Sequence, residues 1–251
     1  MEQRKALVLA LGILTCSSTA AFGGEKVNLE LTADFEGKYI WRGQNVNNES
    51  VFQPSVSLSK YGFTGSIWSN MDLTNKNDSS GEFTEYDFSL DYSSAMPGID
   101  GLDFLVGAIH YRFPNTAFKP TTEVYGGLSF DLPLTPSIKL YRDVDEIDGL
   151  YIQFGIGHIF EKVATFSQDC YCGLQIGAST GWGNSAYNKG YFGIDDSKFN
   201  DLTLTAGFPI CIRLWTIRPS INYSAMLSDS VRSATVHSDN FWGGISISRS
   251  F

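Results

Sequence analysis

The stretch NLELTADFEGKY, residues 28–39, alternates between apolar or small residues and polar residues along its whole length. Successive side chains of a β-strand point to opposite faces, so this period of two predicts a strand with one apolar and one charged face. The fold depends on which face meets water. The apolar or small positions are Leu29, Leu31, Ala33, Phe35, Gly37 and Tyr39, and the polar ones are Asn28, Glu30, Thr32, Asp34, Glu36 and Lys38.

The same alternation recurs along the chain. About twelve segments of roughly ten residues, separated by turn residues, match the pattern of a transmembrane β-barrel. The segments FQPSVSLSKY and EYDFSLDYS show it clearly. We therefore predict an all-β fold, a single antiparallel up-and-down transmembrane barrel over residues 24–251. A water-soluble β-sandwich or small barrel would alternate too, with its apolar face turned inward.

The connections between these segments alternate in length, starting with a long one. Outer-membrane barrels have long external loops and short periplasmic turns, so an even strand number places both chain ends on the periplasmic side. We expect residues 161–169 to form one of the periplasmic turns, although this segment is longer than is ideal for such a turn. The long connections are residues 41–50, 73–82, 114–120, 143–149, 183–200 and 225–239.

Composition favours lipid outside the barrel. The chain has 251 residues, of which 14% are aromatic and only 18% charged. Many aromatic residues stand at segment ends, as the girdles at the two membrane borders require. The net charge of −9 and the lack of a basic patch argue against a nucleic-acid partner.

The N-terminus has the pattern of an export signal. Arg4 and Lys5 precede a short apolar run, residues 6–14, and small residues follow it. That run is too short to span a bilayer as a helix. We predict a signal peptide over residues 1–23, cleaved after Gly23 or Ala20, and a mature chain that reaches the outer membrane of a Gram-negative bacterium through the periplasm.

Three cysteines follow the predicted signal: Cys170, Cys172 and Cys211. Cys170 and Cys172 begin one segment, and Cys211 lies in the next predicted periplasmic turn. Because the intervening strands are neighbours and the compartment can be oxidising, we predict a disulfide from Cys211 to Cys170 or Cys172.

The charged face predicts a wet lumen. Arg42, at the external end of the first segment, has either a structural role, in which it pairs with lumen acids such as Glu36 or Asp87 or caps a turn with Gly43, or a functional one as a selectivity contact at the channel mouth. Acidic rings favour cations, so we expect passive diffusion of small neutral or cationic solutes with no chemical step and no cofactor. The long 183–200 connection could fold inward as a plug or a constriction. The expected pore-lining residues are Glu30, Asp34, Glu36, Lys38, Glu85, Asp87, Asp91, Glu123, Asp201 and Arg218, with Lys139 offsetting the acids.

Two other functional classes stay open. An outer-membrane phospholipase- or protease-like enzyme would need a histidine beside a nucleophile or clustered carboxylates, and the chain has His110, His158 and His237 but no nucleophile motif. A closed structural or adhesive barrel is the other. An acidic loop is more often a solvated surface or a weak divalent-cation site than a catalytic one. The acidic loop here comprises Asp143, Asp145, Glu146 and Asp148.

Three segments resemble known barrels. The ending FWGGISISRSF resembles the C-terminal strand of bacterial outer-membrane proteins, which implies recognition of Phe251 by the barrel assembly machinery. Residues 37–70, GKYIWRGQNVNNESVFQPSVSLSKYGFTGSIWSN, resemble the TorF family of porins, and LYRDVDEIDGLYIQFGIGHIF adds a weaker match. The resemblance implies an outer-membrane porin in contact with membrane lipid, lipopolysaccharide and small solutes. It names no particular solute.

Overall fold

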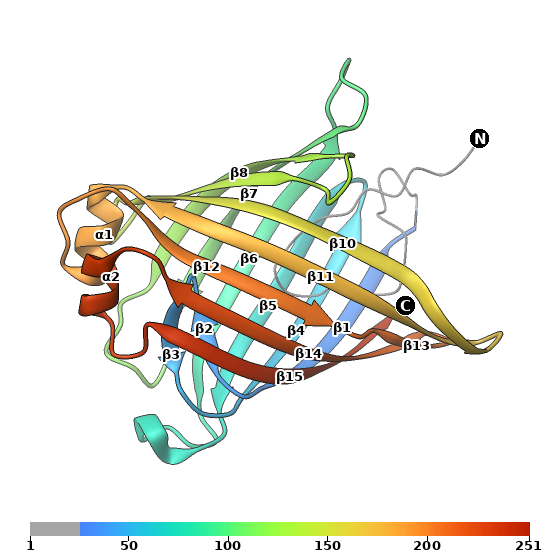
Figure 1. The fold of residues 1–251 in the computed structure, drawn as a ribbon, viewed down its shortest axis with the longest axis horizontal. Coiled ribbons are helices and arrows are strands. Elements are labelled where there is room, and N and C mark those ends of the chain that lie inside the picture. Colours follow the sequence, from blue (N-terminus) through green and yellow to red (C-terminus); the bar gives the residue numbers. More distant parts are fainter. Residues whose placement is uncertain (1–25) are drawn as a thin grey trace.

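The structure is a computed structural model that describes residues 26–251, and its central feature is a closed antiparallel barrel of 12 strands (Figure 1). Closure is made by the first and last strands, because Glu30 pairs with Ser250 and Glu36 with Gly244. The predicted signal peptide, residues 1–23, lies outside the described residues. The barrel strands are β1 (Asn28–Glu36), β4 (Val51–Lys60), β5 (Phe63–Asp72), β6 (Phe83–Ala95), β7 (Leu102–Arg112), β8 (Thr121–Phe130), β9 (Ser137–Asp143), β10 (Leu150–Ser167), β11 (Cys170–Gly183), β12 (Lys198–Gly207), β14 (Trp215–Met226) and β15 (Asp239–Ser250).

A short extra strand, β13 (Ile210–Ile212), follows β12 after an interruption at Phe208 and Pro209. It pairs with β11 on one side and β14 on the other, so it prolongs the stave that β12 begins. The sheet therefore contains 13 strands, although the barrel wall is 12 strands around, because β12 and β13 occupy one strand position in succession.

The distribution of side chains is inverted relative to a soluble protein. Large apolar side chains are exposed on the outer wall, among them Leu90 at 61% and Val106 at 51%. The buried set is mainly polar and includes Glu123 at 2% and Ser224 at 0%. Burying polar groups while exposing apolar ones is favourable only if the outside is hydrocarbon. This confirms the predicted transmembrane barrel and excludes the soluble alternative.

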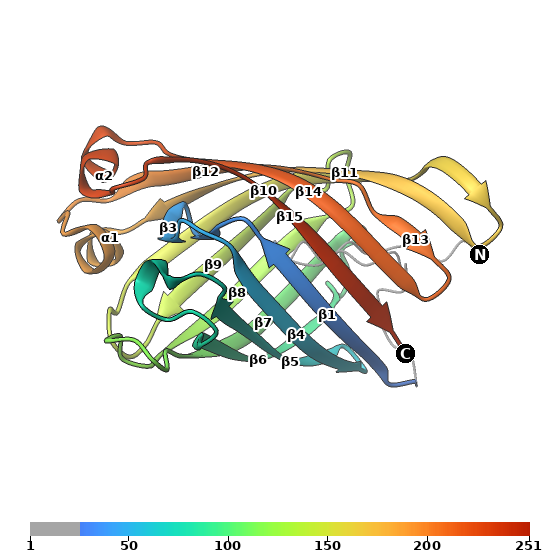
Figure 2. The same ribbon diagram turned by 90° about the horizontal axis from the view of Figure 1, so that it is seen from below.

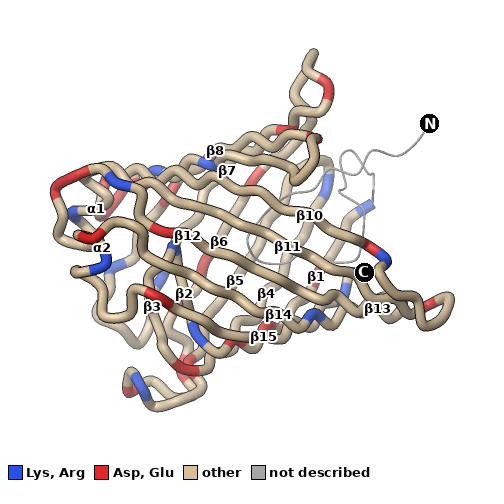
Figure 3. The backbone as a smooth tube through the Cα atoms, in the orientation of Figure 1, with Lys and Arg blue, Asp and Glu red and all other residues tan. Residues whose placement is uncertain are grey.

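Cross-strand pairing holds each face in place. Leu31 pairs with Val56, and Ile67 pairs with both Val56 and Phe88, so apolar residues meet along the outer wall. A slip of one residue would turn every such side chain into the lumen. Figure 3 shows that β10 and β11 carry no charged residues along their middle parts.

The two ends of the barrel differ, as the connection lengths predict. One end, called the loop end, carries the long connections with α1 and α2, while the turn end carries the tight turn after β4 and the chain terminus Phe251 (Figures 1 and 2). Within residues 26–251, neither α-helix is long and apolar enough to cross a membrane. The elements of the loop end are β2 (Tyr39–Trp41), β3 (Gln44–Asn47), η1 (Asn75–Asn77), α1 (Ser185–Phe192) and α2 (Asp229–Ala234).

One connection differs from its prediction. Residues 161–169, expected as a loose turn, continue β10 and β11 into a hairpin that projects from the turn end (Figure 2). Register shifts between Phe160 and Ala164 and between Thr165 and Ser167 mark the extension. Only Gln168 and Asp169 form the actual turn.

The predicted disulfide from Cys211 to Cys170 or Cys172 is wrong, because both of the latter are free thiols. Register gives the reason. Cys211 pairs directly with Tyr171, so the two share one face of the sheet, and the neighbours Cys170 and Cys172 point to the opposite face.

Cys170 and Cys172 are therefore expected to react with a maleimide in folded protein without prior reduction, since both are partly exposed. Peptide mapping by mass spectrometry checks this. A peptide that joins either residue to Cys211 would contradict the register described here.

Candidate functional site

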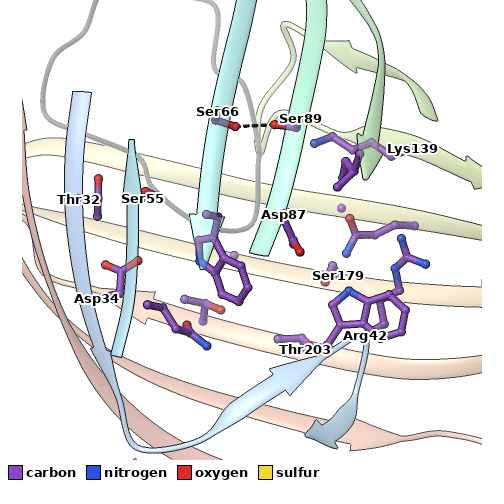
Figure 4. A pocket seen from close by; sticks show the side chains of 18 of the residues that line it. Thr32, Asp34, Arg42, Ser55, Ser66, Asp87, Ser89, Lys139, Ser179 and Thr203 are labelled. Atoms are coloured by element: carbon purple, nitrogen blue, oxygen red, sulfur yellow. Dashed lines mark hydrogen bonds between the residues drawn. The ribbon is translucent and has the colours of Figure 1, made fainter. Parts of the chain in front are cut away.

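A cavity of about 750 Å³ occupies the interior of the barrel. Inward-facing side chains of many strands line it, and most of them carry hydroxyl, carboxylate, amide or basic groups. Figure 4 shows Thr32, Asp87, Lys139 and Thr203 pointing into this common space. The lumen is thus shaped and lined for water and polar solutes.

The structure places every predicted pore-lining residue inside the barrel. Two of them are covered by neighbours and do not reach the cavity. Glu85 accepts a hydrogen bond of 2.9 Å from the Tyr39 hydroxyl, and Glu123 is covered by Arg42. Those that line the cavity are Glu30, Asp34, Glu36, Lys38, Asp87, Asp91, Asp201 and Arg218, together with Lys139.

Uncharged hydroxyl groups form much of the wall on β4, β5 and β6. The Ser66 and Ser89 hydroxyls lie 2.5 Å apart, and those of Ser59 and Thr64 lie 3.0 Å apart. On the other side of the barrel, Arg218 of β14 donates a hydrogen bond of 3.1 Å to Gln175 of β11. The cavity therefore has a hydroxyl-rich wall with charged groups on both sides of it.

The hairpin formed by β2 and β3 folds into the loop end of the lumen. Its turn is the pair Arg42 and Gly43, flanked by the paired residues Trp41 and Gln44. Both turn residues have positive φ, 46° and 79°, as a two-residue type I′ turn requires. A Cβ on Gly43 would lie 2.5 Å from the Cβ of Asp201, so glycine is also needed for the close approach to the wall.

Arg42 makes the central contact of this hairpin. Its guanidinium donates two hydrogen bonds to the Glu123 carboxylate of β8, at 2.6 and 2.8 Å, which is the bidentate geometry of a strong ion pair. The two side chains are only 8% and 2% exposed. Burial alone would lower the pKa of Arg42, but the Glu123 carboxylate raises that pKa well above its ordinary value, so the guanidinium stays charged.

Aromatic rings surround the same guanidinium. Its central carbon lies 4.5, 4.4 and 4.5 Å from the ring centres of Trp41, Tyr141 and Tyr151. Tyr111 donates a hydrogen bond of 2.8 Å to the Glu123 carboxylate from the other side. We call this group of Glu123, Tyr111, Trp41, Tyr141 and Tyr151 the Arg42 cage.

The placement of Arg42 differs in detail from the two expectations. It pairs with a lumen acid, but the partner is Glu123 rather than Glu36 or Asp87, and it lies within the lumen rather than at the outer mouth. The cage rings could not be recognised from sequence, because aromatic residues in barrels are common at the membrane borders.

The 183–200 connection also packs at the loop end. It carries α1, whose N-cap Asn184 accepts a hydrogen bond from the Tyr187 backbone N–H. Tyr187 is 1% exposed and its ring centre lies 5.2 Å from that of Tyr151, while the tilted ring of Tyr191 lies 5.2 Å from that of Trp41 of the hairpin. The helix therefore packs against the hairpin, and a plug or constriction formed by this connection stays a prediction.

Side chains at the loop end are packed to near-complete burial. Asn47 of β3, Val51 of β4, Asn70 of β5 and Ser224 of β14 are at most 2% exposed. These positions all lie near the loop ends of their strands, whereas the cavity extends toward the turn end. The loop end of the lumen is therefore closely packed.

Several residues considered for enzymatic or metal chemistry make other contacts in the structure. His110 lies on the outer wall with its Nδ1 at 3.0 Å from the Thr122 hydroxyl, and His158 packs edge-on against Phe160. The Asp143 carboxylate accepts hydrogen bonds from the Asp145 backbone and the Thr121 hydroxyl. Among residues 26–251, no group of three or more acids, histidines or cysteines is arranged to hold a metal ion.

Comparisons with known proteins support the fold. No protein-family model matches the chain, and no curated protein matches its sequence. LpxR from Salmonella typhimurium superposes with a TM-score of 0.53 at 9% identity, covering 88% of this chain and 99% of that one. The KdgM porin in complex with disordered oligogalacturonate gives a TM-score of 0.51 at 10% identity, covering 89% and 99%. At such identities the likeness shows the fold alone, that of an outer-membrane β-barrel.

Proposed function

We propose that this chain is an outer-membrane porin-like channel for passive diffusion of small neutral or cationic solutes, described here in a state closed at the loop end. The observation that carries the proposal is the polar, charge-lined cavity inside a barrel whose outer wall is apolar. A barrel of twelve strands lies between small filled barrels and wide porins, so it suits small solutes.

The charges that line the cavity set the expected selectivity. Acidic side chains outnumber basic ones along its wall, and an excess of carboxylates favours cations over anions. The acids are Glu30, Asp34, Glu36, Asp87, Asp91 and Asp201, and the bases are Lys38, Arg42, Lys139 and Arg218.

Membership of the TorF family is part of the same proposal. The segment that resembles that family contains Trp41, Arg42 and Gly43, and these residues build the hairpin turn inside the lumen. A turn with this close approach to the opposite wall would restrict substitution there. The residues that resemble the TorF family are thus the same residues that build the hairpin at the loop end.

Contacts outside the barrel remain predictions. Phe251 is 56% exposed, and its backbone exchanges hydrogen bonds with Leu29 at the turn end. An exposed terminal aromatic is consistent with recognition by the barrel assembly machinery. We likewise propose contact of the apolar outer wall with outer-membrane lipid and lipopolysaccharide.

Purified protein in planar bilayers is expected to show discrete conductance steps that favour K⁺ over Cl⁻, because the lining acids repel anions. Asp34→Asn should lower the cation-to-anion permeability ratio by about twofold, as read from the reversal potential in a KCl gradient. Asp148→Asn is the matched control, since Asp148 is an exposed partner of Arg142 outside the cavity.

A folded barrel that never conducts would contradict the channel. Release of fatty acids or peptides by that silent protein would favour the enzyme alternative, so lipase and protease assays on the same preparation separate the two.

A further inference from the structure

Arg42 is held in the way that a bound guanidinium ligand would be held. A carboxylate meets its two nitrogens in a planar fork, and ring faces cover it at 4.4–4.5 Å. These are the two recognition modes that distinguish guanidinium from other cations. The geometry of the Arg42 cage is therefore selective for a chemical group and does not merely accept a positive charge.

Most of the cage belongs to the barrel wall. Tyr111 lies on β7, Glu123 on β8, Tyr141 on β9 and Tyr151 on β10, which are neighbouring strands. Only Trp41 travels with the hairpin. If the hairpin leaves the lumen, the carboxylate and two ring faces stay in place, already arranged for a guanidinium.

Without Arg42, the cage would attract a cation strongly. Glu123 is 2% exposed, and both of its oxygens are engaged by Arg42. A carboxylate so deeply buried is poorly solvated, and without its partner it carries an uncompensated charge. Any mobile cation that fits the space therefore gains the attraction that Arg42 gave up.

We propose that the Arg42 cage is a binding site for small solutes that carry a guanidinium group, and that Arg42 occupies it in the closed state as an internal competitor. The inference rests on the proposed channel function and specifies one class of cationic solute for it. A solute guanidinium displaces Arg42, the hairpin is released, and the loop end opens. Because Arg42 is tethered at an effective concentration in the millimolar range, the solute must act at about millimolar levels.

The first test uses Arg42→Ala protein, in which the cage is vacant. Methylguanidinium and methylammonium are compared as blockers of the K⁺ current in planar bilayers. We expect methylguanidinium to bind about tenfold more tightly, because methylammonium has neither the planar fork nor the stacking face. Adding Glu123→Gln to this variant should remove the difference. Equal binding of the two cations, or a preference that survives Glu123→Gln, would overturn the proposal.

A matched control separates the cage from lumen acidity in general. Glu85 is also a buried carboxylate inside the barrel, but its partner is the Tyr39 hydroxyl. Arg42→Ala combined with Glu85→Gln should therefore keep the preference for methylguanidinium. Loss of the preference in this variant as well would show that the acids act together and that the cage has no special role.

A second measurement does not depend on conduction. In detergent, methylguanidinium should raise the thermal midpoint of Arg42→Ala protein while methylammonium leaves it unchanged. A recording on wild-type protein keeps the test available if Arg42→Ala does not fold: millimolar methylguanidinium should lengthen the openings, and each opening should carry the reduced K⁺ current of a barrel whose cage is occupied. K⁺ current with no effect of methylguanidinium rejects the guanidinium site alone, whereas a barrel with no K⁺ current under any condition rejects the channel.

Discussion

Arg42→Ala is expected to convert a channel that is closed at its loop end into one that conducts most of the time. The substitution leaves the Glu123 carboxylate buried without its partner, and breaking a buried pair in this way costs about 3–5 kcal/mol. That loss falls on the closed state, so the closed-to-open ratio should drop roughly a hundredfold to several thousandfold. Single-channel recordings of open probability measure the effect.

The control for this prediction is Arg142→Ala. Arg142 also pairs with a carboxylate, that of Asp148, but the two side chains are 44% and 75% exposed. Exposed pairs contribute about 0–1 kcal/mol, so this variant should gate like the wild type. If both arginine variants opened the channel equally, the hairpin would not be held by the Arg42 cage.

Ile67→Arg is expected to destabilise the barrel by about 2–4 kcal/mol, the cost of an arginine at the bilayer midplane on the lipid face. Ile67 lies in the middle of β5, is 43% exposed and pairs with the apolar Val56 and Phe88. The free energy of unfolding in lipid vesicles, from urea titration followed by fluorescence, measures the change.

Ser57→Arg provides the comparison from the opposite face. Ser57 lies on the neighbouring β4 and lines the cavity, where a charged group remains hydrated. Its substitution should change the unfolding free energy by less than about 1 kcal/mol while reducing the conductance. The reverse order of the two variants would mean that the apolar face points inward, and the membrane barrel would be wrong.

The two predictions concern separate parts of the molecule. The alternation of apolar and polar residues along the strands gives the wall an apolar outer face, and this face places the barrel in a membrane. In the proposed channel, the hairpin and α1 control conduction, because they fill the loop end with buried residues such as Asn47 and Tyr187. A variant can therefore open the channel without loosening the wall, and the reverse also holds.

The cysteines show where sequence reasoning is insufficient. The three cysteines lie close together at the turn end because their strands are adjacent. A disulfide, however, forms only if both side chains point to the same face of the sheet. Cys211 pairs with Tyr171, so a register difference of a single residue turns Cys170 and Cys172 away from it. Bulges between Phe160 and Ala164 and between Thr165 and Ser167 shift the register of the neighbouring β10–β11 pair as well, and no local pattern in the sequence predicts them.

The sequence by itself determined the wall of the barrel. Alternation with a period of two is a local property, so residues 28–39 already separate Leu31 and Phe35 on the lipid face from Asp34 and Glu36 in the lumen. Connection lengths likewise placed the loop and turn ends. Only the tertiary structure decided that Arg42 bonds Glu123, because the two are 81 residues apart and meet only when the closed barrel brings β8 opposite the hairpin. Contacts across a lumen depend on closure of the barrel and on the path of a loop, and neither produces a periodic pattern in the sequence.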